Sequence, residues 1–243
     1  GDGNDVTLTV QPSNTPPTTN TWTGAHPSGY WSAPANWSPA GVPVNGDELV
    51  FPGGLPPGDM VSTNDLPDSI FRSITFGGAS SRHTIHGNPI TLTNRADCII
   101  NSGTNVIACD LSFSGTPATP DYQYPTIRGS FGSGSGELTV IGNVGGSSLY
   151  FIDEQWGTES RLVIRGRFTG GSLRVLYATL ALYGDNPNAV SAEIRGNQLL
   201  VQGSQPNLNI TLFSDPFKTL TWGSLRGDGQ VGDVTGYGFI VLD

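Results

Sequence analysis

The chain has 243 residues, of which 20 are acidic and 11 are basic, and its formal net charge is −9 at pH 7. This charge argues against nucleic acid and anionic membrane surfaces as partners. Its 34 glycines and 18 prolines lie between apolar and β-branched runs, which indicates many turns in a folded all-β chain rather than disorder. No apolar run approaches the ~18 residues of a spanning helix, so we expect no membrane insertion of this segment.

Residues 1–20 are predicted to form an N-terminal strand followed by a linker. Residues 1–10 hold a Gly/Asp turn that runs into a strand, and residues 11–20, QPSNTPPTTN, have the composition of an extended linker. The chain begins without a signal-like segment. We therefore expect it to be a mature or trimmed part of a larger modular chain.

Residues 21–51 are the most distinctive block, because large aromatic residues fall between Gly, Pro and Ser. The structural interpretation is an aromatic-rich N-terminal cap that covers the open edge of the first coil. The functional interpretation is a platform on which sugar rings stack, with Tyr30, Trp31 and Trp37 as ligand-binding residues. Buried indoles would favour the cap, and an exposed coplanar pair would favour sugar binding.

Residues 52–243 are predicted to be a succession of short strands separated by turns. Alternation such as Ile90-Thr91-Leu92-Thr93 turns one face inward and the other outward. Asparagines are expected at the corners, where they tolerate left-handed backbone. These corner asparagines are Asn88, Asn94, Asn101 and Asn105. The expected strands are residues 49–51, 60–62, 73–76, 83–85, 90–93, 98–100, 106–113, 179–183, 190–195, 198–202, 208–212, 219–222, 231–234 and 239–242.

A degenerate repeat, Leu-x-apolar-x-Gly, organises the second half of the chain. It begins at Leu138, Leu162, Leu180 and Leu199, and its glycines are 24, 18 and 19 residues apart. A spacing of roughly 18–25 residues is typical of one coil of a parallel β-helix. The sequence therefore predicts a β-solenoid in which these four leucines form a column.

The block at residues 21–51 also resembles the opening segment of bacterial surface and secreted proteins that carry autotransporter-associated β-strand repeats. The likeness lies in a Trp-x-Gly start, an Asn-Trp-Ser centre and a Pro…Asp…apolar-Phe close. Here those residues are Trp22 and Gly24, then Asn36, Trp37 and Ser38, then Pro43, Asp47, Val50 and Phe51.

The resemblance implies a right-handed parallel β-helix outside the cell or on the bacterial surface. Such proteins are passenger-like and serve as stalks, adhesins or parts of secreted modular proteins. The implied partners are glycans or host-surface components. The resemblance brings no catalytic motif and no cofactor with it, so we expect a non-enzymatic module.

One acidic pair keeps an enzyme open as the alternative. Asp153 and Glu154 are followed closely by Trp156, an aromatic residue that suits a bound sugar. Enzymes that degrade polysaccharides need clustered carboxylates, but acidic pairs in turns are commonly solvated surface. Asp153 and Glu154 are therefore the catalytic candidates of the alternative, and Trp156 is a further sugar-binding candidate.

The cysteines and histidines suggest two further sites. A disulfide between Cys98 and Cys109 would close a loop of about 11 residues and contribute about 2–3 kcal/mol, whereas the alternative is two buried thiols on neighbouring strands. His83 and His86 are expected to point to opposite faces of a strand and its turn, which makes them a poor chelating pair. We therefore predict no metal site.

Overall fold

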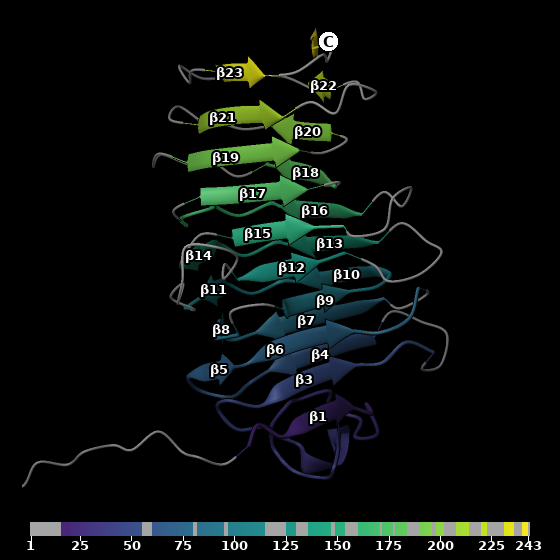
Figure 1. Ribbon diagram of the computed structural model, residues 1–243. Helices are drawn as coiled ribbons and strands as arrows, with labels where there is room; N and C mark the ends of the chain where they lie inside the picture. Colours follow the sequence, from purple (N-terminus) through teal and green to yellow (C-terminus); the bar gives the residue numbers. More distant parts are fainter. Residues whose placement is uncertain are drawn as a thin grey trace, which may run out of the picture.

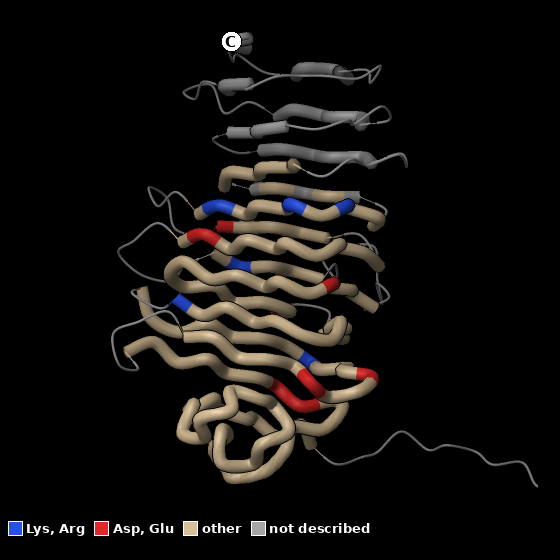
Figure 2. The backbone as a smooth tube through the Cα atoms, turned by 180° about the vertical axis from the view of Figure 1, so that it is seen from behind, with Lys and Arg blue, Asp and Glu red and all other residues tan. Residues whose placement is uncertain are grey.

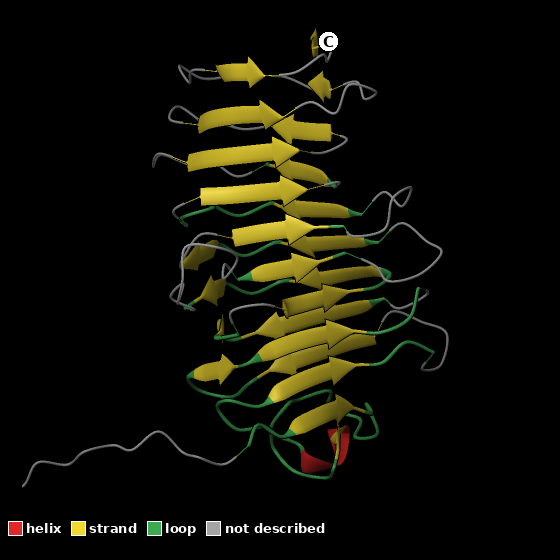
Figure 3. Ribbon diagram, viewed as in Figure 1, coloured by secondary structure: helices red, strands yellow, loops and turns green. Residues whose placement is uncertain are grey.

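A computed structural model describes most of the chain up to residue 183 and the backbone of the strands that follow. The described ranges are 16–54, 60–79, 82–94, 97–114, 125–129, 136–146, 149–153, 160–170, 172–176 and 178–183, and, as backbone, 190–195, 198–201, 208–213, 220–222, 231–235 and 240–242. Within these ranges the protein is all-β, apart from η1 (Pro34–Asn36), one 3-10 turn drawn red in Figure 3.

Parallel sheets run along the long axis of the molecule, as Figure 1 shows. The longest, sheet A, has the spatial order β2 (Trp37–Ser38), β1 (Thr19–Trp22), β3 (Glu48–Phe51), β6 (Ser73–Phe76), β9 (Asp97–Asn101), β12 (Thr126–Arg128), β15 (Leu149–Ile152), β17 (Ser172–Leu176), β19 (Val190–Arg195), β21 (Leu208–Phe213) and β23 (Val231–Thr235).

Two shorter sheets stand beside sheet A. Sheet B has the order β4 (Met60–Asn64), β7 (His83–Gly87), β10 (Thr104–Ile107), β13 (Glu137–Val140), β16 (Arg161–Ile164), β18 (Thr179–Leu182) and β20 (Gln198–Val201). Sheet C has the order β5 (Ser69–Phe71), β8 (Ile90–Leu92), β11 (Leu111–Phe113) and β14 (Val144–Gly146). A separate pair, β22 (Leu220–Trp222) and β24 (Ile240–Leu242), lies near the C-terminal end.

The chain passes through the sheets in a fixed order. The stretch of chain from one strand of sheet A up to the next strand of sheet A is called a circuit here. From β3 to β14 it passes through sheets A, B and C four times in succession. Each strand of one circuit pairs in parallel with the corresponding strand of the next. The predicted column of leucines is confirmed, because Leu138 pairs with Leu162, Leu162 with Leu180 and Leu180 with Leu199.

The core lies between the sheets and forms one cluster to which all three contribute. In sheet A, the inward-facing residues stack directly on one another through successive circuits. This buried column consists of Leu49, Ile74, Ile99, Ile127, Phe151 and Val175. Because a strand of three to five residues buries only two or three side chains, each circuit depends on its neighbours for a complete core.

The glycine of the repeat motif sits where the backbones of consecutive circuits touch. A Cβ atom on Gly142 would lie 2.2 Å from the carbonyl oxygen of Cys109, and one on Gly166 would lie 2.2 Å from that of Gly142. Both contacts are with backbone, which has little freedom to move aside. The motif therefore ends in glycine because no side chain fits between stacked corners.

Residues 16–47, called the cap segment here, cover the first edge of all three sheets. In sheet A, β1 pairs in parallel with β3, and β2 closes the edge in the antiparallel direction. In sheet B, Trp31 N donates to the carbonyl oxygen of Thr63 at 3.0 Å. In sheet C, Gly46 N donates to the carbonyl oxygen of Ile70 at 2.8 Å. The cap segment thus satisfies backbone groups that an open edge would leave unpaired.

Two sequence expectations about strands differ from the structure. Residues 106–113 are not one strand, because residues 108–110 turn the corner between β10 and β11. The side chain of Asp110 accepts a hydrogen bond from Asn143 N at 2.7 Å at this corner. The second difference is that the predicted linker ends early, since β1 begins at Thr19. Residues 1–15 lie outside the described part.

Candidate functional site

The indoles predicted to stack on sugars are buried inside the cap segment. Trp31 is 0% and Trp37 is 2% exposed, and their rings meet edge-to-face with centroids 5.7 Å apart. Trp31 Nε1 donates to Ser62 Oγ at 3.1 Å, and Trp37 Nε1 donates to Trp31 O at 2.9 Å. Neither ring offers a free face, so the ligand-binding role predicted for these two residues is corrected to a packing role.

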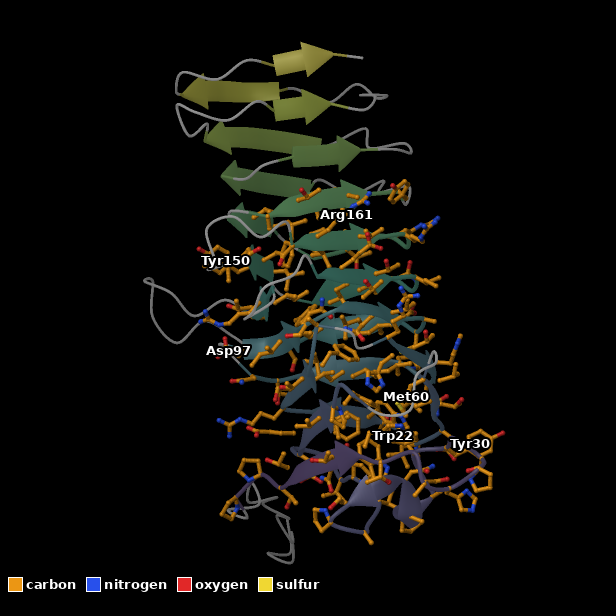
Figure 4. The ribbon with its side chains drawn as sticks, turned by 90° about the vertical axis from the view of Figure 1, so that its right-hand side faces the viewer. Trp22, Tyr30, Met60, Asp97, Tyr150 and Arg161 are labelled. Atoms are coloured by element: carbon orange, nitrogen blue, oxygen red, sulfur yellow. The ribbon has the colours of Figure 1, made fainter. Side chains whose placement is uncertain are left out.

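Tyr30 is the exposed member of the predicted sugar-binding set, with 48% of its surface accessible. Figure 4 shows its side chain pointing away from the molecule, whereas Trp22 points inward. Its backbone forms an isolated parallel bridge to Thr63 beside the first strand of sheet B. A single exposed ring does not make the coplanar pair that a sugar platform requires. Trp156, the remaining candidate, lies outside the described residues.

Asp153, one of the two catalytic candidates, is 0% exposed. It follows β15 at a corner, and its Oδ2 accepts a hydrogen bond from Ser160 N at 3.2 Å. A catalytic carboxylate must reach its substrate, and this one is enclosed by the protein. Glu154 lies outside the described residues.

The two cysteines are free thiols in the structure, which corrects the proposed disulfide. Cys98 belongs to β9 in sheet A, whereas Cys109 occupies the corner between sheets B and C. Burial raises the pKa of each thiol to about 12. Cys98 Sγ also donates to the carbonyl oxygen of Asn94. Both thiols are therefore protonated at neutral pH and unreactive while the core is closed.

The histidine pair is divided as expected between two faces of a strand. His83 is buried, and His86 on the same strand is exposed. Among the described residues, no group of three His, Cys, Asp or Glu side chains is arranged to hold a metal ion. The described part of the chain also contains no helix long and apolar enough to cross a membrane.

A hollow of about 550 Å³ lies where the cap segment meets the corners between sheets C and A. We call it the corner groove. Its apolar surface comes from Pro16, Pro17 and Val44, and the side chain of Val44 is 63% exposed. The volume falls within the range of about 300–1,000 Å³ that small-molecule sites occupy. It is the candidate site of this protein.

Polar side chains from three successive circuits complete the corner groove. Asn45 precedes β3, Arg72 lies between β5 and β6, and Thr93 and Asn94 follow β8. Parallel stacking brings them together although almost 50 residues separate the first from the last. Backbone hydrogen bonds between circuits fix these corners, including Asn94 N to the carbonyl oxygen of Arg72 at 3.0 Å.

The charged side chains at the corner groove already have hydrogen-bond or ion-pair partners. The carboxylate of Asp47 is 5% exposed and accepts hydrogen bonds from Thr18 N, Asn20 Nδ2 and Val44 N at 3.1, 2.7 and 2.9 Å. Arg72 Nε lies 3.2 Å from Glu48 Oε1. Figure 2 shows how sparse the charged residues are along the rest of the described stack. The groove is thus polar, and its one cation within the described residues is paired with an acidic side chain.

Sequence reasoning missed the corner groove. Its residues come from separate stretches between residues 16 and 94, and no single motif contains them, although Asp47 belongs to the Pro…Asp…apolar-Phe pattern. One partial signal was present, since Val42 and Val44 are apolar residues in an irregular, turn-rich stretch, and both are exposed. Exposed apolar residues in turns mark a surface of interest only once their spatial grouping is known.

No protein-family model, curated protein or solved structure matches the chain. The likeness to proteins with autotransporter-associated repeats, and the location and partners that it implies, therefore stay predictions.

Proposed function

We propose that this chain is a right-handed parallel β-helix and a non-enzymatic module of a bacterial surface or secreted protein. In this proposal its circuits are the coils of the helix, and its role is that of an elongated scaffold for adhesion or display outside the cell.

The observation that carries the proposal is the uninterrupted parallel pairing of strands along the sheets. Ten strands of sheet A, from β1 to β23, follow one another in parallel. At about 4.8 Å per strand, the nine intervals give a stack about 43 Å tall. Each interior strand is paired on both sides, so local opening must break two sets of hydrogen bonds. Rigidity and resistance to proteases suit a spacer that stands outside the cell.

The cap segment supports the same proposal. It covers the edges of sheets A, B and C at one end, which prevents end-to-end pairing with other strands. The residues that do this include Trp31 and Trp37 of the segment that resembles the opening of repeat-bearing surface proteins. Because the cap segment covers these edges, the first circuit does not present bare strands that would make the scaffold aggregate.

Three measurements test the scaffold role and its location. Small-angle X-ray scattering should give an elongated particle, and the folded core should survive trypsin or subtilisin under conditions that digest a globular control protein. Antibodies raised against the module should label intact cells of the source organism or find it in the culture medium. A compact particle, rapid digestion of the core or labelling only after cell lysis would contradict the proposal.

A further inference from the structure

We propose that the corner groove binds a neutral saccharide. This role goes beyond the scaffold function and does not depend on it. The groove combines an apolar surface with several hydrogen-bonding groups and, within the described residues, has no unpaired cation, which suits an uncharged, hydroxyl-rich ligand with one apolar face.

Among the residues that the structure describes, the groove holds both hydrogen-bond donors and hydrogen-bond acceptors that have no protein partner. Arg72 uses only Nε in its ion pair with Glu48, so among the described residues its two terminal nitrogens have no partner. Asn45 accepts from Ile70 N at 3.1 Å through Oδ1, which leaves its amide NH₂ as a donor. Asn94 donates to the carbonyl oxygen of Asp97 at 3.1 Å, which leaves its Oδ1 as an acceptor. Sugar hydroxyls donate and accept, so they satisfy both kinds.

Charge decides between a neutral and an acidic ligand. The three donors to Asp47 are uncharged, and the only cation that lines the groove, within the described residues, is already paired with Glu48. An anionic ligand would have to compete with Glu48 on a protein whose net charge is −9. A neutral ligand meets neither obstacle, so the electrostatics favour it.

The apolar surface supplies the remaining contact. Val44 is 63% exposed, and Pro16 and Pro17 are exposed beside it. The C–H face of a sugar ring covers such a surface and removes it from water. The backbone is fixed in advance, because Val44 N donates to Asp47 Oδ2 and Thr93 N donates to the carbonyl oxygen of Phe71 at 2.9 Å. Binding therefore costs little ordering of the protein.

The experiment uses the full chain and an array of short neutral oligosaccharides of glucose, galactose, mannose and xylose, with uronic-acid oligosaccharides beside them. Wild type should retain at least one neutral member, whose Kd is then measured by calorimetry. Val44→Ser and Arg72→Gln should each weaken this Kd by about fivefold to tenfold. The Kd should change by less than about twofold between about 0.1 M and about 1 M NaCl, because no ion pair forms with the ligand.

Matched substitutions outside the groove serve as controls. Val61 on β4 is exposed to a similar extent as Val44, at 55% against 63%, and Arg82 is an exposed arginine before β7. Val61→Ser and Arg82→Gln should leave the Kd within about twofold of wild type. Circular dichroism and urea midpoints establish that all four variants are folded.

Three results would overturn the proposal: no neutral oligosaccharide is retained, the groove variants bind as well as the controls, or affinity collapses as salt rises. None of them touches the scaffold role, since scattering and proteolysis measure that role without a ligand.

Discussion

Single polar side chains hold successive circuits together at the corners. Asp110 Oδ1 accepts from Asn143 N at 2.7 Å, and Asn143 Oδ1 accepts from Arg167 N at 3.0 Å. Each side chain satisfies a backbone N–H of the following circuit at a place where the strand ladder is interrupted. Asn and Asp suit these positions because their short side chains reach neighbouring backbone without displacing the turn.

His83 shows what burial does to an ionisable side chain in this core. It is 3% exposed and packs against Phe51, with ring centroids 5.5 Å apart. Its Nε2 lies 3.0 Å from the carbonyl oxygen of Pro52, to which it donates in the corresponding tautomer. Desolvation lowers the pKa of His83 from its ordinary value of 6.5, and the bond to Pro52 only partly opposes this effect. The neutral imidazole is therefore the form that the fold accepts.

Stability should consequently fall in mild acid. Below pH 6.5 the unfolded chain takes up a proton on His83 before the folded chain does, so the stability present above that pH is lost as the pH falls. The slope attributable to this one residue is at most about 1.4 kcal/mol per pH unit. Urea unfolding between about pH 8 and about pH 5 measures it.

His83→Gln should remove that part of the slope, whereas His86→Gln, at an exposed position of the same strand, should retain it. An identical pH dependence in wild type and His83→Gln would show that the buried imidazole is not responsible.

Gly142 illustrates a different constraint at the same scale, namely the close approach of two backbones. Gly142→Ala should lower the free energy of unfolding by about 1–3 kcal/mol, because the added Cβ atom overlaps the backbone of Cys109. Gly41→Ala is the matched control, since the nearest atom to its added Cβ lies 4.0 Å away. The control should stay within about 0.5 kcal/mol of wild type in urea unfolding. Equal stability of the two variants would mean that the stacked corners are looser than the structure has them.

At the scale of elements, the irregular repeat spacing has a structural cause. In sheet A, Phe151 pairs with Val175, which lies 24 residues later in the chain. The next partners along the same column, Ile194 and Leu212, follow at intervals of only 19 and 18 residues. After the bridge between Val144 and Phe168, the described residues contain no further strand of sheet C. A circuit without its third side needs fewer residues, so the spacing shortens while the register of sheets A and B continues.

The stacked strands also explain why ion pairs join residues of consecutive circuits. Glu137 and Arg161 are register partners in sheet B, and their side chains meet at 3.4 Å. Arg128 forms a diagonal ion pair with Asp97 on the preceding strand of sheet A, since the register partner of Asp97 is Thr126. Parallel stacking brings residues at matched or diagonal positions of neighbouring circuits within reach, so opposite charges there pair across circuits. These pairs are partly exposed and contribute little stability, but they favour the correct register.

For the whole molecule, the decisive feature is that one end is sealed by the cap segment. Removing residues 1–47 would expose the first strands β3, β4 and β5 as three parallel edges. We expect the truncated protein to self-associate as its concentration rises, because bare edges pair with other strands. Sedimentation velocity compared with the full chain measures this effect.

A charged version of the truncation separates edge pairing from simple unfolding. Val61 on β4 and Ile70 on β5 are exposed side chains on the bared strands, so Val61→Lys with Ile70→Lys should restore a monomer without changing the core. If the plain truncation stays monomeric and folded at every concentration, the cap segment has no role in sealing the end.

Much of the architecture was readable in the sequence. The spacing of Leu138, Leu162, Leu180 and Leu199 predicted their column, and most strands after residue 48 begin within two residues of their expected positions. The cap interpretation of residues 21–51 agrees with the burial of their tryptophans. The candidate site was not readable, because the corner groove joins Val44, Arg72 and Asn94 from three circuits.

The sequence by itself determined the all-β character, the stacking of the leucine column and the glycine corners, because each follows from a local pattern that recurs along the chain. Only the tertiary structure decided which aromatic rings are buried, that Cys98 and Cys109 are free thiols, and where a hollow opens on the surface. These features depend on which distant segments come into contact, and a chain acquires such contacts only when successive circuits pack together.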